Sequence, residues 1–201
     1  MPSIYDLKSR FQDLLRPLVN RLASIGITAN QVTVLAMLLS FTAGGLIVLL
    51  PGMHWPLLAI PVVLFVRMAL NAIDGMLARE HDMKSPLGAI LNELGDVLSD
   101  AALYLPLALI AGVNATLIVL VVLIAVVSEM TGVVAIQIGA QRRYDGPMGK
   151  SDRAFVFGAV GLLLGLGVDP QPWLDIVLLL VLALLGLTVF NRSRRALAEV
   201  G

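Results

Sequence analysis

Oxygen-bearing side chains gather in one stretch of an otherwise apolar chain. The first two are spaced three residues apart, and the last three recur at intervals of four, so on helices each set shares one face. A short charged segment ending in Ser-Pro separates the two sets and indicates a turn between antiparallel helices. Such a turn would point the two sets at one another. They are Asn71, Asp74, Asn92, Asp96 and Asp100.

Carboxylate and amide oxygens in this arrangement favour metal chemistry. Hard divalent cations such as Mg²⁺ take these ligands in proteins, with substrate phosphates completing the shell. A carboxylate at membrane depth costs roughly 3 kcal/mol, so a cluster of them indicates function. The alternative is a set of buried polar residues that only pack helices together. Asp100 lies one turn beyond Asp96 on the same face, and we expect it to add charge to the site.

The same stretch resembles the signature of the CDP-alcohol phosphotransferases, which is Asp-x2-Asp-Gly-x2-Ala-Arg, a spacer, and Gly-x3-Asp-x3-Asp. Two positions depart from it, because Asn71 and Asn92 stand where the family has its first and third aspartates. The matching positions are Asp74, Gly75, Ala78, Arg79, Gly88 and Asp96.

The resemblance implies a metal-dependent transferase. By this likeness two divalent cations, Mg²⁺ or Mn²⁺, grip the pyrophosphate of a CDP-linked substrate, and Asp96 is the general base. The implied partners are a CDP-diacylglycerol-type lipid donor and a small hydroxyl acceptor, with CMP as the leaving group. We expect the metal ligands among Asn71, Asp74, Asn92, Asp96 and Asp100.

Substrate contacts are expected on both sides of the motif. Gly75 and Ala78 are small enough for a nucleotide to approach, and Arg79 offers phosphate a fork of donors. Helix packing by small residues and an Arg reaching the membrane interface are the alternatives. Asn30 and Thr33 resemble a family pattern that we place near the cytidine, although a helix cap by Thr28 or Asn30 fits equally.

A second basic segment follows later in the chain. Lys150 and Arg153 resemble a weaker family feature near the acceptor or phosphate pocket. Ordinary positive charge on a cytoplasmic loop explains them as well. Arg67 and Glu129 belong to no motif, and we expect each to pair with a neighbouring helix.

Composition places these residues in a membrane protein. Of 201 residues, 58% are hydrophobic and only 14% are charged, whereas soluble domains carry about a quarter charged residues. The chain has no cysteine and two histidines, so disulfides, thiol catalysis and a zinc site are not expected. Residues 1–201 are predicted to form one domain.

The elements that must position the site are helices. We predict an all-α integral membrane fold, with six transmembrane helices after an N-terminal amphipathic helix in the interface. Residues 4–22 carry an apolar face that includes Ile4 and Leu7, a polar face that includes Lys8, and a kink at Pro17. The predicted spans are 30–50, 55–80, 87–111, 115–140, 153–168 and 172–191.

Charge decides the predicted orientation. With six spans, every Lys and Arg except Arg67 falls on one side of the bilayer. The positive-inside rule then places both termini and the active site in the cytoplasm, in an integral cell (inner) membrane protein. The lipid bilayer is an expected partner, nucleic acid is not, and a homodimer is left open.

Other functions remain open at this level. A soluble CDP-alcohol donor with a diacylglycerol acceptor is the nearest one. A cation or proton transporter would also bury carboxylates, although no inverted repeat is visible. The two asparagines allow a catalytically inactive family member. The acceptor, and whether it is phosphorylated, is left undetermined.

Overall fold

The computed structural model describes residues 4–201, with side chains from residue 10 onward. This part of the chain is helical between its turns and holds no strand. The elements are α1 (Ile4–Ser24), α2 (Ala29–Leu49), α3 (Trp55–Glu80), α4 (Pro86–Tyr104), η1 (Leu105–Leu109), α5 (Ala115–Val134), η2 (Ala135–Ile138), α6 (Lys150–Gly165) and α7 (Trp173–Val200).

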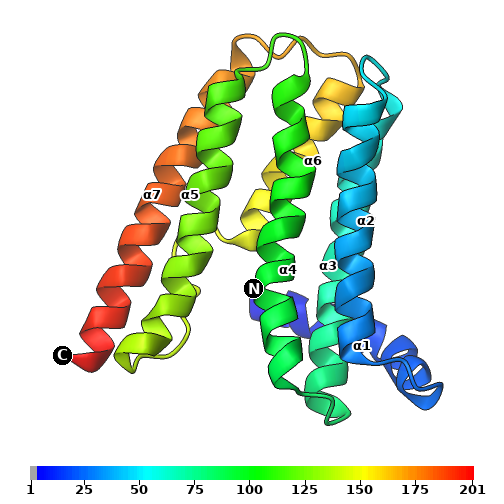
Figure 1. Ribbon diagram of the computed structural model, residues 1–201, viewed down its shortest axis with the longest axis vertical. Coiled ribbons are helices and arrows are strands. Elements are labelled where there is room, and N and C mark those ends of the chain that lie inside the picture. Colours follow the sequence, from blue (N-terminus) through cyan, green and yellow to red (C-terminus); the bar gives the residue numbers. More distant parts are fainter. Residues whose placement is uncertain (1–3) are drawn as a thin grey trace.

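The predicted N-terminal helix is present as α1. Val19 is fully buried against the last turns of α3, whereas Leu14 on the opposite side is exposed. Pro17 lies inside the helix. The predicted faces also rest on Ile4, Leu7 and Lys8, whose side chains lie outside the described part. The helix lies at the end of the bundle that carries the turn between α3 and α4 (Figure 1).

Four of the predicted spans are confirmed by length and apolarity. They are α2, α3, α5 with η2, and α7. The other two predicted spans differ for physical reasons. α4 carries three carboxylates in 19 residues, and α6 has only 16 residues with three charged side chains in its first turn. A six-span arrangement therefore stays a prediction for these two helices.

The helices divide into two packed groups. α3 packs against α2 and α6, and α2 also packs against α4, while α5 pairs with α7 (Figure 1). One apolar core joins the groups through residues of α2 to α7, among them Leu64, Leu103, Val121, Phe157 and Leu178. The N- and C-terminal helices end at the same end of the bundle (Figure 1).

Close backbone contact fixes α4 against α2. A Cβ atom built on Gly44 would lie 1.9 Å from the carbonyl oxygen of Ala102, so only glycine permits this approach. At the other end of α4, the Ser85 hydroxyl caps the helix by accepting from the Gly88 amide at 3.0 Å. The predicted turn before Pro86 is thus confirmed, and α4 runs antiparallel to α3 (Figure 1).

Candidate active site

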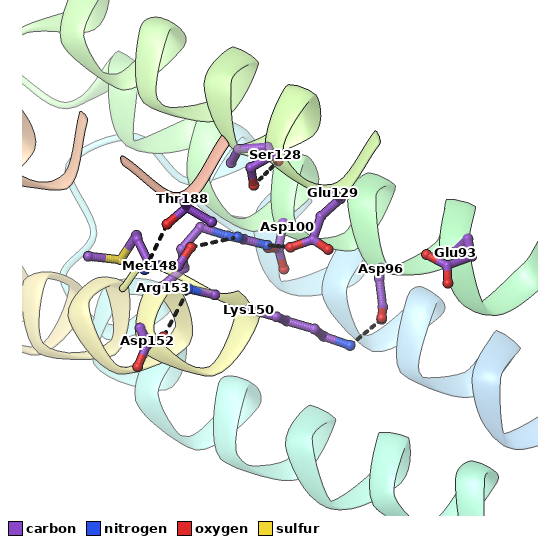
Figure 2. Close-up of polar contacts among 12 residues, drawn as sticks. Glu93, Asp96, Asp100, Ser128, Glu129, Met148, Lys150, Asp152, Arg153 and Thr188 are labelled. Carbon is purple, nitrogen blue, oxygen red and sulfur yellow. Dashed lines mark hydrogen bonds and ion pairs between the residues drawn. The ribbon is translucent and has the colours of Figure 1, made fainter. Parts of the chain in front are cut away.

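Asp96 lies where side chains of three helices meet. Its Oδ1 atom accepts from Lys150 Nζ of α6 (Figure 2) and lies 3.5 Å from Asn71 Nδ2 of α3. Arg67 of α3 donates to its backbone carbonyl at 3.0 Å. The side chain remains 25% exposed. Among the described residues no donor contacts its Oδ2 atom, so one carboxylate oxygen is free to meet a substrate.

Asp74 belongs to the same region but is more buried. Its Oδ2 atom accepts a hydrogen bond of 2.7 Å from the Thr33 hydroxyl of α2. This contact joins Thr33 to a motif carboxylate, and its place near the cytidine stays a prediction. Thr28 caps α2 through a reciprocal capping box with Gln31, so the capping alternative is confirmed for that residue.

Asp100 lies one turn further along α4 and is enclosed by arginines. Its Oδ1 atom is 2.5 Å from Arg67 Nη1, and its Oδ2 atom is 2.9 Å from Arg153 Nη2. All three side chains are almost fully buried, and two guanidinium groups that stay charged repel a metal cation. The structure thus separates Asp100 from the predicted metal set and confirms the expected helix-to-helix pair for Arg67.

Glu129 forms the centre of a cluster that the sequence did not reveal. Its Oε1 atom is 3.1 Å from Arg153 Nη2, and its Oε2 atom is 3.3 Å from both Arg142 Nη2 and Arg192 Nη1. Arg142 also forms a fork with Glu93 at 2.5 and 2.7 Å. The pairing expected for Glu129 is confirmed, but no spacing in the sequence marked Arg192 as a partner.

The segment between η2 and α6 is held in place so that α6 begins beside α4. Gly146 (φ +122°) packs on Thr188 of α7, and the Thr188 hydroxyl accepts from the Met148 amide at 3.0 Å. Asp152 accepts from the Gly149 amide at 2.9 Å and caps α6 (Figure 2). These contacts position the first turn of α6 so that its side chains reach the carboxylates of α4.

Ion pairs hold the outer part of that segment. Asp145 lies 2.8 Å from Arg143 and 3.1 Å from Arg195, and Arg143 also contacts Glu199 at 2.6 Å. Burial alone would raise the pKa of Asp145, but the hydrogen bond and charge of Arg143, with Arg195, hold that pKa below its usual value. The segment is therefore fastened to the end of α7.

Arg79 lies over the glycine of its own motif. A Cβ atom on Gly75 would be 3.1 Å from both terminal nitrogens of Arg79, so the glycine makes room for the guanidinium. Arg79 is exposed and pairs with no described carboxylate. Ala78 packs into the small core shared by α1, α2 and α3, which supports the packing alternative for that residue.

Among the described residues, two predicted ones make no hydrogen bond with the motif carboxylates. Asn30 donates to the Ser85 hydroxyl at 3.4 Å and lies where a Cβ on Gly88 would clash with it. It therefore lies beside the first turn of α4. Asn92 is exposed on α4 and has no polar partner among the described side chains.

The oxygen set fits only part of a metal shell. In the described part of the chain no three His, Cys, Asp or Glu side chains form a group that holds a metal. Asp74 and Asp96, with the amide of Asn71, nevertheless offer the oxygen donors that Mg²⁺ or Mn²⁺ prefers. These residues fit a cation that takes its remaining oxygens from a bound pyrophosphate.

Comparison with known proteins decides the family. The family model for CDP-alcohol phosphatidyltransferase matches residues 26–195. The chain belongs to this family. The CDP-alcohol phosphatidyltransferase assignment makes it a membrane transferase of phospholipid synthesis, consistent with its apolar helices.

Similar proteins match the chain over nearly its full length. The inner membrane protein YnbA of Escherichia coli K12 is 43% identical over 195 residues, covering 97% of this chain and 96% of YnbA. Phosphatidylinositol phosphate synthase (PgsA1) of Mycobacterium tuberculosis with CDP-DAG bound shares the fold, with a TM-score of 0.70, 19% identity and 92% coverage of both chains. Its complex with manganese and citrate gives a TM-score of 0.70 at 21% identity, covering 92% of this chain and 90% of that one.

Proposed function

We propose that the protein transfers a phosphatidyl group from CDP-diacylglycerol to an alcohol and releases CMP. The observation that carries this is Asp96, a half-buried carboxylate with one free oxygen, reached by Asn71 and Lys150 from two other helices. Support for the donor comes from the family and from the CDP-DAG complex of the mycobacterial neighbour.

In the proposed reaction the acceptor oxygen bonds to the phosphorus that carries the lipid. The bond from that phosphorus to the CMP oxygen breaks, and CMP leaves with the electron pair. The acceptor proton passes to Oδ2 of Asp96, while Lys150 and Asn71 hold Oδ1 and orient the carboxylate. A general base placed in this way contributes about 10²–10⁴-fold to the rate.

A divalent cation, Mg²⁺ or Mn²⁺, is proposed as the cofactor, held by Asp74, Asp96 and the amide oxygen of Asn71. When bound, it would neutralise charge on the pyrophosphate. Asn92 is exposed nearby on α4 and is kept as a further candidate ligand. Asp100 is omitted from the proposed set, because Arg67 and Arg153 occupy both of its oxygens.

The donor is proposed to bind along the last turns of α3. Arg79 is exposed over Gly75 and offers phosphate a planar pair of donors. Asn30 lies beside the first turn of α4, and Thr33 donates a hydrogen bond to Asp74. Both residues would border the nucleotide. The lipid tails would then extend into the bilayer. The basic ends of the helices support a cytoplasmic site by the positive-inside rule.

The decisive assay measures CMP release from CDP-diacylglycerol by the purified protein, with and without Mg²⁺. A panel of alcohols is offered as acceptors, and mass spectrometry identifies the lipid product. Metal-dependent CMP release with a new phospholipid supports the proposal. CMP release only from a soluble CDP-alcohol with diacylglycerol would reverse donor and acceptor. No release from either donor, with intact folding, would indicate an inactive relative or a transporter.

A further inference from the structure

Three guanidinium groups from separate segments converge on a single carboxylate. Arg142 comes from the segment before α6, Arg153 from the first turn of α6 and Arg192 from α7, and each lies 3.1 to 3.3 Å from Glu129 of α5. Arg153 and Arg192 are each only 2% exposed, and Glu129 is 8% exposed. Figure 2 shows Glu129 beside Arg153 and Asp100.

Such a convergence of arginines resembles the way in which proteins bind oxyanions. Planar guanidinium forks match carboxylate and phosphate oxygens, and convergent arginines are the usual means of binding a phosphate group. Here the anion is a side chain of the protein, because the two Glu129 carboxylate oxygens form ion pairs with all three guanidinium groups.

Each of these arginines also contacts at least one further group. Arg142 forms its fork with Glu93, Arg153 holds Asp100, and Arg192 donates to the backbone carbonyls of Asp145 and Ser128. While Glu129 holds these arginines, a phosphate group bound to them would be a second buried anion beside the glutamate. Like charges brought together in this way repel one another, so phosphate binding is disfavoured.

The cluster lies next to the proposed base. Lys150 and Arg153 share the first turn of α6, and the first contacts Asp96 while the second contacts both Asp100 and Glu129 (Figure 2). A phosphate carried by an acceptor whose hydroxyl meets Asp96 would therefore point toward these arginines.

We infer that Glu129 is a built-in anion that closes the three-arginine site to phosphate, and that the acceptor is therefore an alcohol without a phosphate group. The inference about the acceptor rests on the proposed transferase function. The closure of the anion site by Glu129 does not depend on catalysis, so it is tested separately.

The first test uses inorganic phosphate and the full-length protein in detergent. Glu129→Gln keeps the shape of the side chain but removes its charge, so the arginines become available to a free anion. At constant ionic strength, phosphate should raise the melting temperature of Glu129→Gln and bind it at least about tenfold more tightly than the wild type. A tenfold difference in affinity corresponds to about 1.4 kcal/mol. Binding of phosphate to the wild type as tight as to the variant would overturn the inference.

Glu199→Gln is the matched control. It also removes a glutamate paired with an arginine, but at a more exposed contact with Arg143. Phosphate should not stabilise it more than the wild type. Equal phosphate stabilisation of both variants would mean that any unpaired arginine suffices, and would contradict a specific site at Glu129.

The second test compares glycerol with glycerol 3-phosphate as acceptors. The wild type should release CMP with glycerol and not with glycerol 3-phosphate, and Glu129→Gln should shift the ratio of kcat/KM by about tenfold or more toward the phosphorylated alcohol. Wild-type preference for glycerol 3-phosphate overturns the inference even if the variant does not fold. If neither acceptor yields CMP, the proposed function fails, while the phosphate titration still decides whether Glu129 closes the site.

Discussion

Arg67 and Asp100 join α3 to α4 through a buried ion pair of 2.5 Å between Nη1 and Oδ1. The same guanidinium donates to the backbone carbonyl of Asp96 at 3.0 Å. Arg67 therefore fixes the position of the α4 turn that carries the proposed base. Because Asp100 also holds Arg153, this one carboxylate connects α3, α4 and α6.

The first prediction concerns the stability of this connection. Asp100→Asn should lower the free energy of unfolding by about 3–5 kcal/mol, because two buried guanidinium groups lose a charged partner. Arg67→Gln should cost less, since Asp100 keeps Arg153. Thermal unfolding in detergent measures both, and the reverse ranking would contradict this account.

Asp13→Asn provides the matched control for that series. Asp13 and Arg16 are also joined at 2.5 Å, but on the exposed side of α1. Solvent screens such pairs, so the melting temperature should stay close to that of the wild type.

The second prediction separates the two motif aspartates. Asp96→Asn keeps an oxygen ligand but removes the base, so donor binding should persist while turnover falls by about 10²–10⁴-fold. Asp74→Asn should instead weaken Mg²⁺-dependent donor binding, and high Mn²⁺ should partly restore it. Binding of CDP-diacylglycerol and single-turnover CMP release measure the two effects. Normal turnover by Asp96→Asn would remove it from the proposed role.

The third prediction concerns phosphate recognition by Arg79. Arg79→Lys keeps the charge but loses the planar pair of donors, so affinity for CDP-diacylglycerol should fall. Arg194→Lys serves as a control at a basic position of α7 away from the motif, and should bind the donor normally. Unchanged donor affinity in Arg79→Lys would leave interfacial charge as the explanation of this residue.

The fourth prediction uses two adjacent glycines of α2. Gly44→Ala should destabilise the protein by about 1–3 kcal/mol, because its Cβ would overlap the Ala102 carbonyl of α4. Gly45→Ala meets no atom within 4 Å and should stabilise the helix by about 0.5–1 kcal/mol. Thermal unfolding of the two variants should therefore shift in opposite directions.

The fifth prediction tests orientation. The chain has no native cysteine, so single cysteines can be labelled cleanly. Cysteine replacing Met53 or Val168 should react with an impermeant reagent in intact cells, and cysteine replacing Lys84 or Gln141 should react only after lysis. All four positions are exposed. The opposite labelling pattern would place the site outside the cytoplasm.

The sequence by itself determined the helices, the turn before Pro86 and the family. Apolar runs and the spacing of Asp74, Gly75 and Arg79 are local properties, and local periodicity is sufficient to predict them. Three of the helices that are long and apolar enough to cross a membrane are α2, α3 and α5. Each begins within one residue of the start predicted for it.

Only the tertiary structure decided which charges belong together. Asp96 and Asp100 look alike in sequence, one turn apart on α4, but Lys150 and Asn71 reach the first, while Arg67 and Arg153 enclose the second. The Glu129 cluster likewise joins α5 to the segment before α6, to α6 and to α7, and Arg192 of α7 lies far from Glu129 along the chain. Ion pairs between helices depend on crossing position and rotation about the helix axis, which follow from packing such as that of Gly44 on Ala102 and are absent from local spacing.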